Sequence, residues 1–86
     1  MTKYNLIKKY IDEFDYYDLL KHGAPDNEFD IYSKYFCDVI NKEDSVEKIA
    51  ETISNRMDRA FGNEVRPDRF IDTAKKIKDG LIALNV

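Results

Sequence analysis

Apolar residues recur along the chain at steps of three and four, the spacing that places side chains on one face of an α-helix. No segment shows the sustained alternation of apolar and polar residues that is typical of a half-buried strand. A chain of 86 residues also has the size of one compact domain. The pattern therefore predicts an all-α fold, a single bundle of four to five short helices over residues 1–86.

The first predicted helix begins after Thr2, whose hydroxyl can cap free amides, and ends near Phe14. Its expected inward stripe is Leu6, Ile7, Tyr10, Ile11 and Phe14. Asp15 is expected to cap a short second helix over residues 16–22, which Gly23 then ends. Because Tyr16 and Tyr17 are adjacent, they cannot both face one core.

A third helix is expected to begin at Asp26 or Asn27, and a fourth runs from a cap at Asp44 or Ser45 to Gly62. The third helix should bury Phe29, Tyr32, Phe36, Val39 and Ile40. The fourth should bury Val46, Ile49, Ala50, Ile53, Met57, Ala60 and Phe61.

Pro67 suits the first position of a fifth helix, because proline lacks the amide that would be free there. The apolar stripe of this helix is Phe70, Ala74, Ile77, Leu81 and Leu84. Gly80 lies inside it and lowers helix stability by about 1 kcal/mol relative to alanine, unless close packing requires a glycine.

The net charge of −3 is unevenly distributed along the chain. Residues 1–10 carry three lysines and no acid, residues 11–44 carry ten acids against three bases, and residues 45–86 carry seven acids against eight bases. The acidic middle segment repels phosphate backbones and attracts cations. The expected partner is therefore a cationic protein, with no direct binding to nucleic acid.

Side chains with catalytic or metal-binding chemistry are few. His22, the only histidine, is expected to face solvent at a helix end, and Cys37, the only cysteine, to be a small core residue. The acidic set Asp26, Glu28 and Asp30 does not continue as a calcium-binding loop, because the required glycine and glutamate positions hold Ile31 and Cys37. No metal, no cofactor and no catalytic residue is predicted.

One cysteine and the absence of an apolar leader or membrane-length apolar run predict a cytoplasmic location and no membrane association.

Nine of the eleven aromatic residues lie in the first 36 positions, interleaved with the acidic segment. Tyrosine among carboxylates combines rigid contact area with electrostatic steering, a combination used by inhibitors of basic enzymes. Some of these carboxylates also suit helix starts, so structural and binding roles overlap. The predicted partner-binding residues are Asp12, Glu13, Asp15, Tyr16, Tyr17, Asp18, Asp26, Glu28 and Asp30.

The stretches "FDYYDLLKHGAPDNEFD" and "SVEKIAETISNRMDRAFG" resemble the small bacterial YugE-like family, a domain of unknown function. The likeness spans roughly residues 5 to 62. The matching positions are Asp15, Leu19, Leu20, Gly23, Ala24, Pro25, Asp26, Glu28, Phe29, Asp30, Ile49, Ala50, Phe61 and Gly62. The chain departs from the family pattern at Phe14 and Tyr16, where the family has tryptophan and proline.

The resemblance implies a small helical fold without known catalysis. Similar proteins are found among the immunity proteins of bacterial toxin systems, including contact-dependent growth inhibition, in which a small acidic protein neutralises a basic nuclease. The leading hypothesis is therefore a non-enzymatic immunity protein that binds a cognate cationic toxin, with a nuclease as the expected activity. The alternatives are a helical adaptor that self-associates as a homodimer through exposed tyrosines and phenylalanines, and a small enzyme that uses His22.

Overall fold

The computed structural model describes all residues from 1 to 86. It contains four α-helices, α1 (Lys3–Phe14), α2 (Asp30–Val39), α3 (Val46–Ala60) and α4 (Ile71–Leu84). Two short 3-10 helices, η1 (Tyr16–Asp18) and η2 (Pro67–Phe70), follow α1 and precede α4. The predicted all-α fold is confirmed. None of the helices combines the length and the apolar composition needed to cross a membrane.

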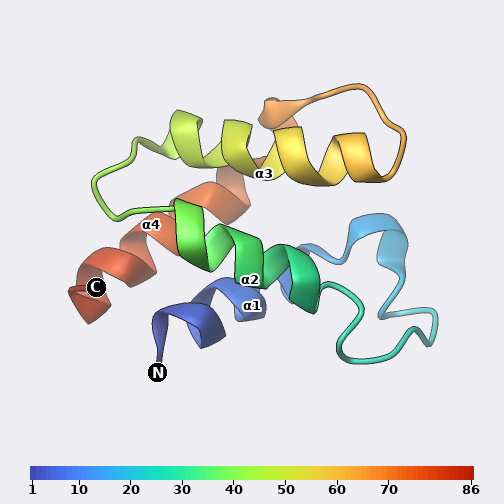
Figure 1. The fold of residues 1–86 in the computed structure, drawn as a ribbon, viewed down its shortest axis with the longest axis horizontal. Helices are drawn as coiled ribbons and strands as arrows, with labels where there is room; N and C mark the ends of the chain where they lie inside the picture. Colours follow the sequence, from blue (N-terminus) through green and yellow to red (C-terminus); the bar gives the residue numbers. More distant parts are fainter.

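The four α-helices pack around one core (Figure 1). α1 contacts both α2 and α4, and α3 contacts α4 and η2. In the view of Figure 1, α2 lies in front of α1 and α4, and both chain termini lie on the same side. The segment that joins α1 to α2 forms the opposite end of the molecule, where it carries η1.

The helices begin and end largely where local chemistry predicts. The Thr2 hydroxyl accepts a hydrogen bond from the Asn5 amide, and the Ser45 hydroxyl accepts one from the Lys48 amide. These bonds satisfy donors that have no partner inside the helix. Gly62, just after α3, has a φ of 73°, which glycine adopts without strain.

The start of α2 differs from the prediction. Residues 26–29 form turns in which the Glu28 amide donates to the Pro25 carbonyl, and α2 begins only at Asp30. The Nζ of Lys8 in α1 binds both the carbonyl of Asp26 and the carboxylate of Asp30. This lysine holds the two residues on one side of α1, and Phe29 between them turns into the core.

The core consists of 15 buried apolar residues drawn from every helical element. They are Leu6, Ile7, Ile11, Tyr16, Phe29, Phe36, Ile40, Ile49, Ala50, Ile53, Met57, Phe70, Ala74, Ile77 and Leu81. Val39 and Ala60, predicted to be inside, are exposed. Val39 is exposed because of helical geometry: Ser33, and not Val39, lies on the buried face of α2 with Phe36.

Gly80 faces α1 at close range. A Cβ atom at this position would lie 2.7 Å from both Cδ atoms of Leu6. The glycine therefore lets α4 approach α1 more closely than an alanine would. This close packing explains why a residue of low helix propensity lies inside α4.

Candidate partner-binding site

The tyrosine turn, residues 15–18, connects α1 to the loop that leads to α2. Three of its four residues have left-handed backbone conformations, with φ of 52° at Asp15, 57° at Tyr17 and 55° at Asp18. Each such residue other than glycine costs roughly 1–2 kcal/mol. Contacts elsewhere must therefore hold the turn in place.

Asp15 supplies one of these contacts. Its carboxylate accepts hydrogen bonds from the amides of Leu20, at 2.7 Å, and Lys21, at 3.0 Å. The prediction that Asp15 caps a helix over residues 16–22 is wrong in detail, because the residue itself ends α1 and η1 is only three residues long. Its side chain instead closes the loop that follows η1.

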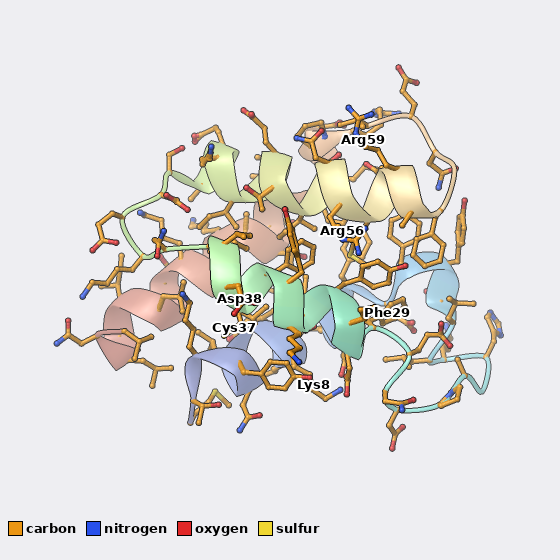
Figure 2. All side chains as sticks on the ribbon, viewed as in Figure 1. Lys8, Phe29, Cys37, Asp38, Arg56 and Arg59 are labelled. Atoms are coloured by element: carbon orange, nitrogen blue, oxygen red, sulfur yellow. The ribbon has the colours of Figure 1, made fainter.

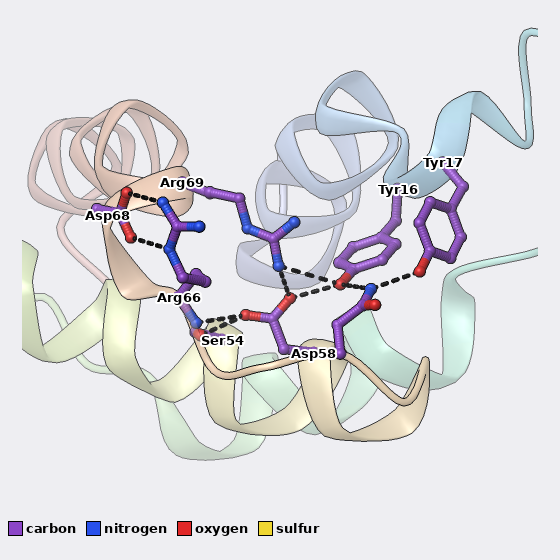
Figure 3. A network of polar contacts seen from close by, with 8 residues as sticks. Tyr16, Tyr17, Ser54, Asp58, Arg66, Asp68 and Arg69 are labelled. Carbon is purple, nitrogen blue, oxygen red and sulfur yellow. Dashed lines mark hydrogen bonds and ion pairs between the residues drawn. The ribbon is translucent and has the colours of Figure 1, made fainter.

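Tyr16 supplies the second contact. Its side chain is only 2% exposed, and its ring stacks on Phe61 with centroids 4.4 Å apart. The Tyr16 hydroxyl donates a hydrogen bond to the Asp58 carboxylate and accepts one from the side-chain NH2 group of Asn63 (Figure 3). Tyr16 is therefore an anchor of the turn and not a surface residue, which removes it from the predicted binding residues.

Asp58 on α3 is fully buried and gathers four hydrogen bonds, from the Tyr16 and Ser54 hydroxyls, the Arg66 amide and the Arg69 guanidinium (Figure 3). Burial raises the pKa of this carboxyl, but the hydrogen bonds from Ser54 and Tyr16 and the charge of Arg69 outweigh burial, so the pKa is lowered overall. The carboxylate is therefore ionised at neutral pH and joins η1, α3 and the start of η2.

Tyr17 points outward from this support. Its side chain is 58% exposed, although its hydroxyl accepts a hydrogen bond from Asn63 at 2.5 Å. Its ring packs edge-on against Tyr16 and Phe61, with centroids 4.9 and 5.5 Å apart. The prediction that the two adjacent tyrosines cannot both face one core is confirmed, and Tyr17 is an exposed aromatic side chain held in one position.

A shallow hollow of about 180 Å³ opens beside the turn. It is lined by Phe14, Asp15, Tyr16, Tyr17, Asp18 and Arg69. The Arg69 charge is matched by buried Asp58, whereas the Asp18 carboxylate is exposed and makes no ion pair. The rim of the hollow therefore offers an unpaired negative charge next to an exposed aromatic ring.

The remaining predicted binding residues fall into two groups. Asp12 and Asp30 both form ion pairs with Lys8, at 2.8 and 2.5 Å, and Glu13 pairs with Lys76 of α4 at 2.6 Å. The Lys76 hydrogen bond lowers the pKa of Glu13, and the two carboxylates raise the pKa of Lys8. The acidic segment is thus partly neutralised by lysines from other parts of the chain.

The second group consists of carboxylates without an ion pair. Asp26 and Glu28, in the acidic loop of residues 24–29, are exposed and form no ion pair, as is also the case for Asp18. The tyrosine turn and the acidic loop belong to the same connection between α1 and α2 at one end of the molecule (Figure 1). The structure therefore reduces the predicted surface to Tyr17, Asp18, Asp26 and Glu28.

Two further side chains, His22 and Cys37, are candidates by residue type for catalytic or metal-binding chemistry. His22 is exposed, and Cys37 is half-buried at the edge of the core. No group of three or more histidine, cysteine, aspartate or glutamate side chains is arranged to hold a metal ion. Every phenylalanine is buried or half-buried, so the alternative of self-association cannot use exposed phenylalanines, whereas Tyr17 and Tyr35 are exposed.

Comparisons of the chain with protein-family models, with curated proteins and with solved structures gave no match.

Proposed function

We propose that the protein is a non-enzymatic immunity protein that neutralises a cationic toxin domain by binding it through Tyr17, Asp18, Asp26 and Glu28. The observation that carries the proposal is Tyr17, which is 58% exposed although its hydroxyl and its ring are both held by neighbours. A rigid exposed tyrosine loses little conformational entropy when a partner covers it, and such residues often dominate binding energy.

The unpaired carboxylates support a cationic partner. Asp18, Asp26 and Glu28 are exposed carboxylates without ion pairs in the same connection as Tyr17, so lysines or arginines of a partner can reach them. Charges of this kind accelerate association and favour partners of opposite sign more than they increase affinity. The class of partner, a bacterial toxin with a basic active-site surface, comes from the sequence resemblance, and the inhibition proposed is occlusion of that surface.

The test begins with a search of the reading frames next to that of this chain for a basic toxin domain, which is then purified. Association rate constants are measured by stopped-flow fluorescence over a series of salt concentrations. The double variant Asp18→Lys with Glu28→Lys should associate at least about tenfold more slowly at low salt, with a weaker salt dependence. Tyr17→Ala should mainly increase the dissociation rate, by roughly thirtyfold for an aromatic anchor.

A matched control carries the same change in charge on α3, as Glu47→Lys with Glu51→Lys, where both carboxylates are exposed and form no ion pair. This control should change the association rate far less than the double variant at the site. Equal effects of the two double variants would show that only net charge matters and would refute the site. Failure of the parent protein to protect cells that express the toxin would refute the immunity function itself.

A further inference from the structure

The outward face of α2 carries an apolar stripe that is exposed along its length. Ile31, Tyr35 and Val39 are spaced four residues apart and are 65%, 43% and 39% exposed. The inward face of the same helix already fills the core through Phe36. In Figure 1, α2 lies in front of α1 and α4, so its outward face looks away from the rest of the molecule.

The central residue of the stripe is ordered before any partner arrives. Arg56 of α3 places its guanidinium 5.4 Å from the centroid of the Tyr35 ring and 5.5 Å from that of Tyr32. Figure 2 shows Arg56 extending from α3 toward α2. Because these cation–π contacts restrict Tyr35, covering it requires less loss of side-chain entropy than covering a free tyrosine.

Two charged residues lie beside the stripe and identify the occupant. Lys34 and Asp38 are exposed, four residues apart on one flank of α2, and neither forms an ion pair within the chain. When two copies of a helix pack antiparallel about a two-fold axis, each flank meets the same flank of the other copy in reverse order. Lys34 then meets Asp38 of the second copy, and Asp38 meets Lys34 of the second copy.

We infer that α2 is a homodimer surface, with a second copy of this chain packed antiparallel on the stripe. In this arrangement Tyr35 lies near its own counterpart, and Ile31 lies near Val39 of the second copy. Two symmetric ion pairs flank this apolar contact. In a parallel pair about a two-fold axis each flank would meet the opposite flank of the other copy, so Lys34 and Asp38 would not meet, and the two ion pairs favour the antiparallel arrangement. The inference uses a different surface from the partner-binding site and does not depend on the proposed function.

The size of the surface sets the expected affinity. A helix of ten residues is about 15 Å long. α2 lies on the broad side of a molecule that measures 33 × 26 × 19 Å. One helix pair covers less than the roughly 800 Å² per partner of a standard interface. The dimer should therefore be weak, with a dissociation constant on the order of 10–100 µM.

The test is sedimentation equilibrium of the purified chain from about 5 µM to about 1 mM, which brackets that dissociation constant. The parent protein should change from monomer to dimer over this range. Lys34→Asp and Asp38→Lys each create repulsion at both symmetric contacts and should weaken the homodimer about tenfold. An equimolar mixture of the two variants should restore dimerisation, because each acidic flank then meets a basic one.

Ile31→Lys should leave the protein monomeric, whereas Ile82→Lys, at an isoleucine on α4 that is 54% exposed, should dimerise like the parent. Circular dichroism of each variant establishes that it is folded. A parent that stays monomeric throughout the range would overturn the inference and leave the stripe to a different protein. A dimer that persists in Ile31→Lys, or a mixture no better than its components, would overturn the antiparallel α2 arrangement.

Discussion

Replacing the buried carboxylate of Asp58 tests whether the polar network holds the tyrosine turn. The Ser54 hydroxyl and the Arg66 amide donate to Oδ2 of Asp58, and the Tyr16 hydroxyl and the Arg69 guanidinium donate to Oδ1. Asparagine has nearly the same shape, but one of its two terminal atoms is an NH2 group. Either orientation therefore places a donor against another donor.

The hydroxyls can rotate to accept from the new NH2 group, but the Arg66 amide and the Arg69 guanidinium cannot. One of these donors loses its acceptor in each orientation, and Arg69 loses its ionic partner in both. A buried donor without an acceptor costs about 1–3 kcal/mol, and a broken buried ion pair costs about 3–5 kcal/mol. Because the Arg69 side chain is 37% exposed and can reach water, Asp58→Asn should cost about 2–4 kcal/mol.

A domain of this length has a total stability of roughly 4–13 kcal/mol, so the variant should fold with a melting temperature lowered by about 10–25 °C. Urea denaturation followed by far-UV circular dichroism at neutral pH measures the difference. Asp68→Asn is the matched control, since Asp68 pairs with Arg66 at the surface, and its unfolding midpoint should stay at the parent value. Coincident midpoints for Asp58→Asn and the parent would refute the reasoning.

Further predictions concern pH and packing. The pKa of Asp58 is near 4 in the unfolded chain and lower in the folded chain, so the free energy of unfolding should fall as the pH drops below about 4. This decrease should be less steep in Asp58→Asn. Urea denaturation repeated at a series of acidic pH values measures both. Gly80→Ala should destabilise the fold by about 1 kcal/mol because the new Cβ atom overlaps Leu6. In a Leu6→Ala background the same substitution should stabilise the fold by about 1 kcal/mol. If urea titrations gave Gly80→Ala the same effect in both backgrounds, the overlap would be refuted. Ser33→Ala should stabilise the fold by about 1 kcal/mol, since the buried Ser33 hydroxyl has no hydrogen-bond partner. A urea midpoint below that of the parent would show that this hydroxyl does form a hydrogen bond.

Helix positions could be predicted from the sequence where one residue decides them. Thr2 and Ser45 cap helices in the structure as their side chains imply, and Gly62 follows α3 with positive φ. Residues 26–29 were harder to predict, because the cap preferences of Asp26 and Asn27 compete with the pull of Phe29 into the core and with bonds from Lys8. Local preference is too weak to outweigh such tertiary contacts.

The candidate site was predicted only in part. Tyr17, Asp18, Asp26 and Glu28 are exposed as the prediction requires. Counting charges along the sequence could not show that Lys8 and Lys76 form ion pairs with the other predicted carboxylates. Asp58 was missed although a signal existed, since Ser54 and Asp58 fall on the apolar face of α3, four residues apart. A carboxylate on such a face indicates a buried polar network when donors from distant segments can reach it.

The Asp58 network also bears on the order in which the chain assembles. Tyr16 and Asp58 are 42 positions apart, and Arg69 reaches the carboxylate from the far side of the loop after α3. Since a carboxylate gives up its hydration only when replacement donors are in place, docking of α1 and α3 against α4 should precede closure of this junction. Weakening the junction should therefore hasten unfolding while leaving the refolding rate nearly unchanged, so that the lifetime of the native state depends on it.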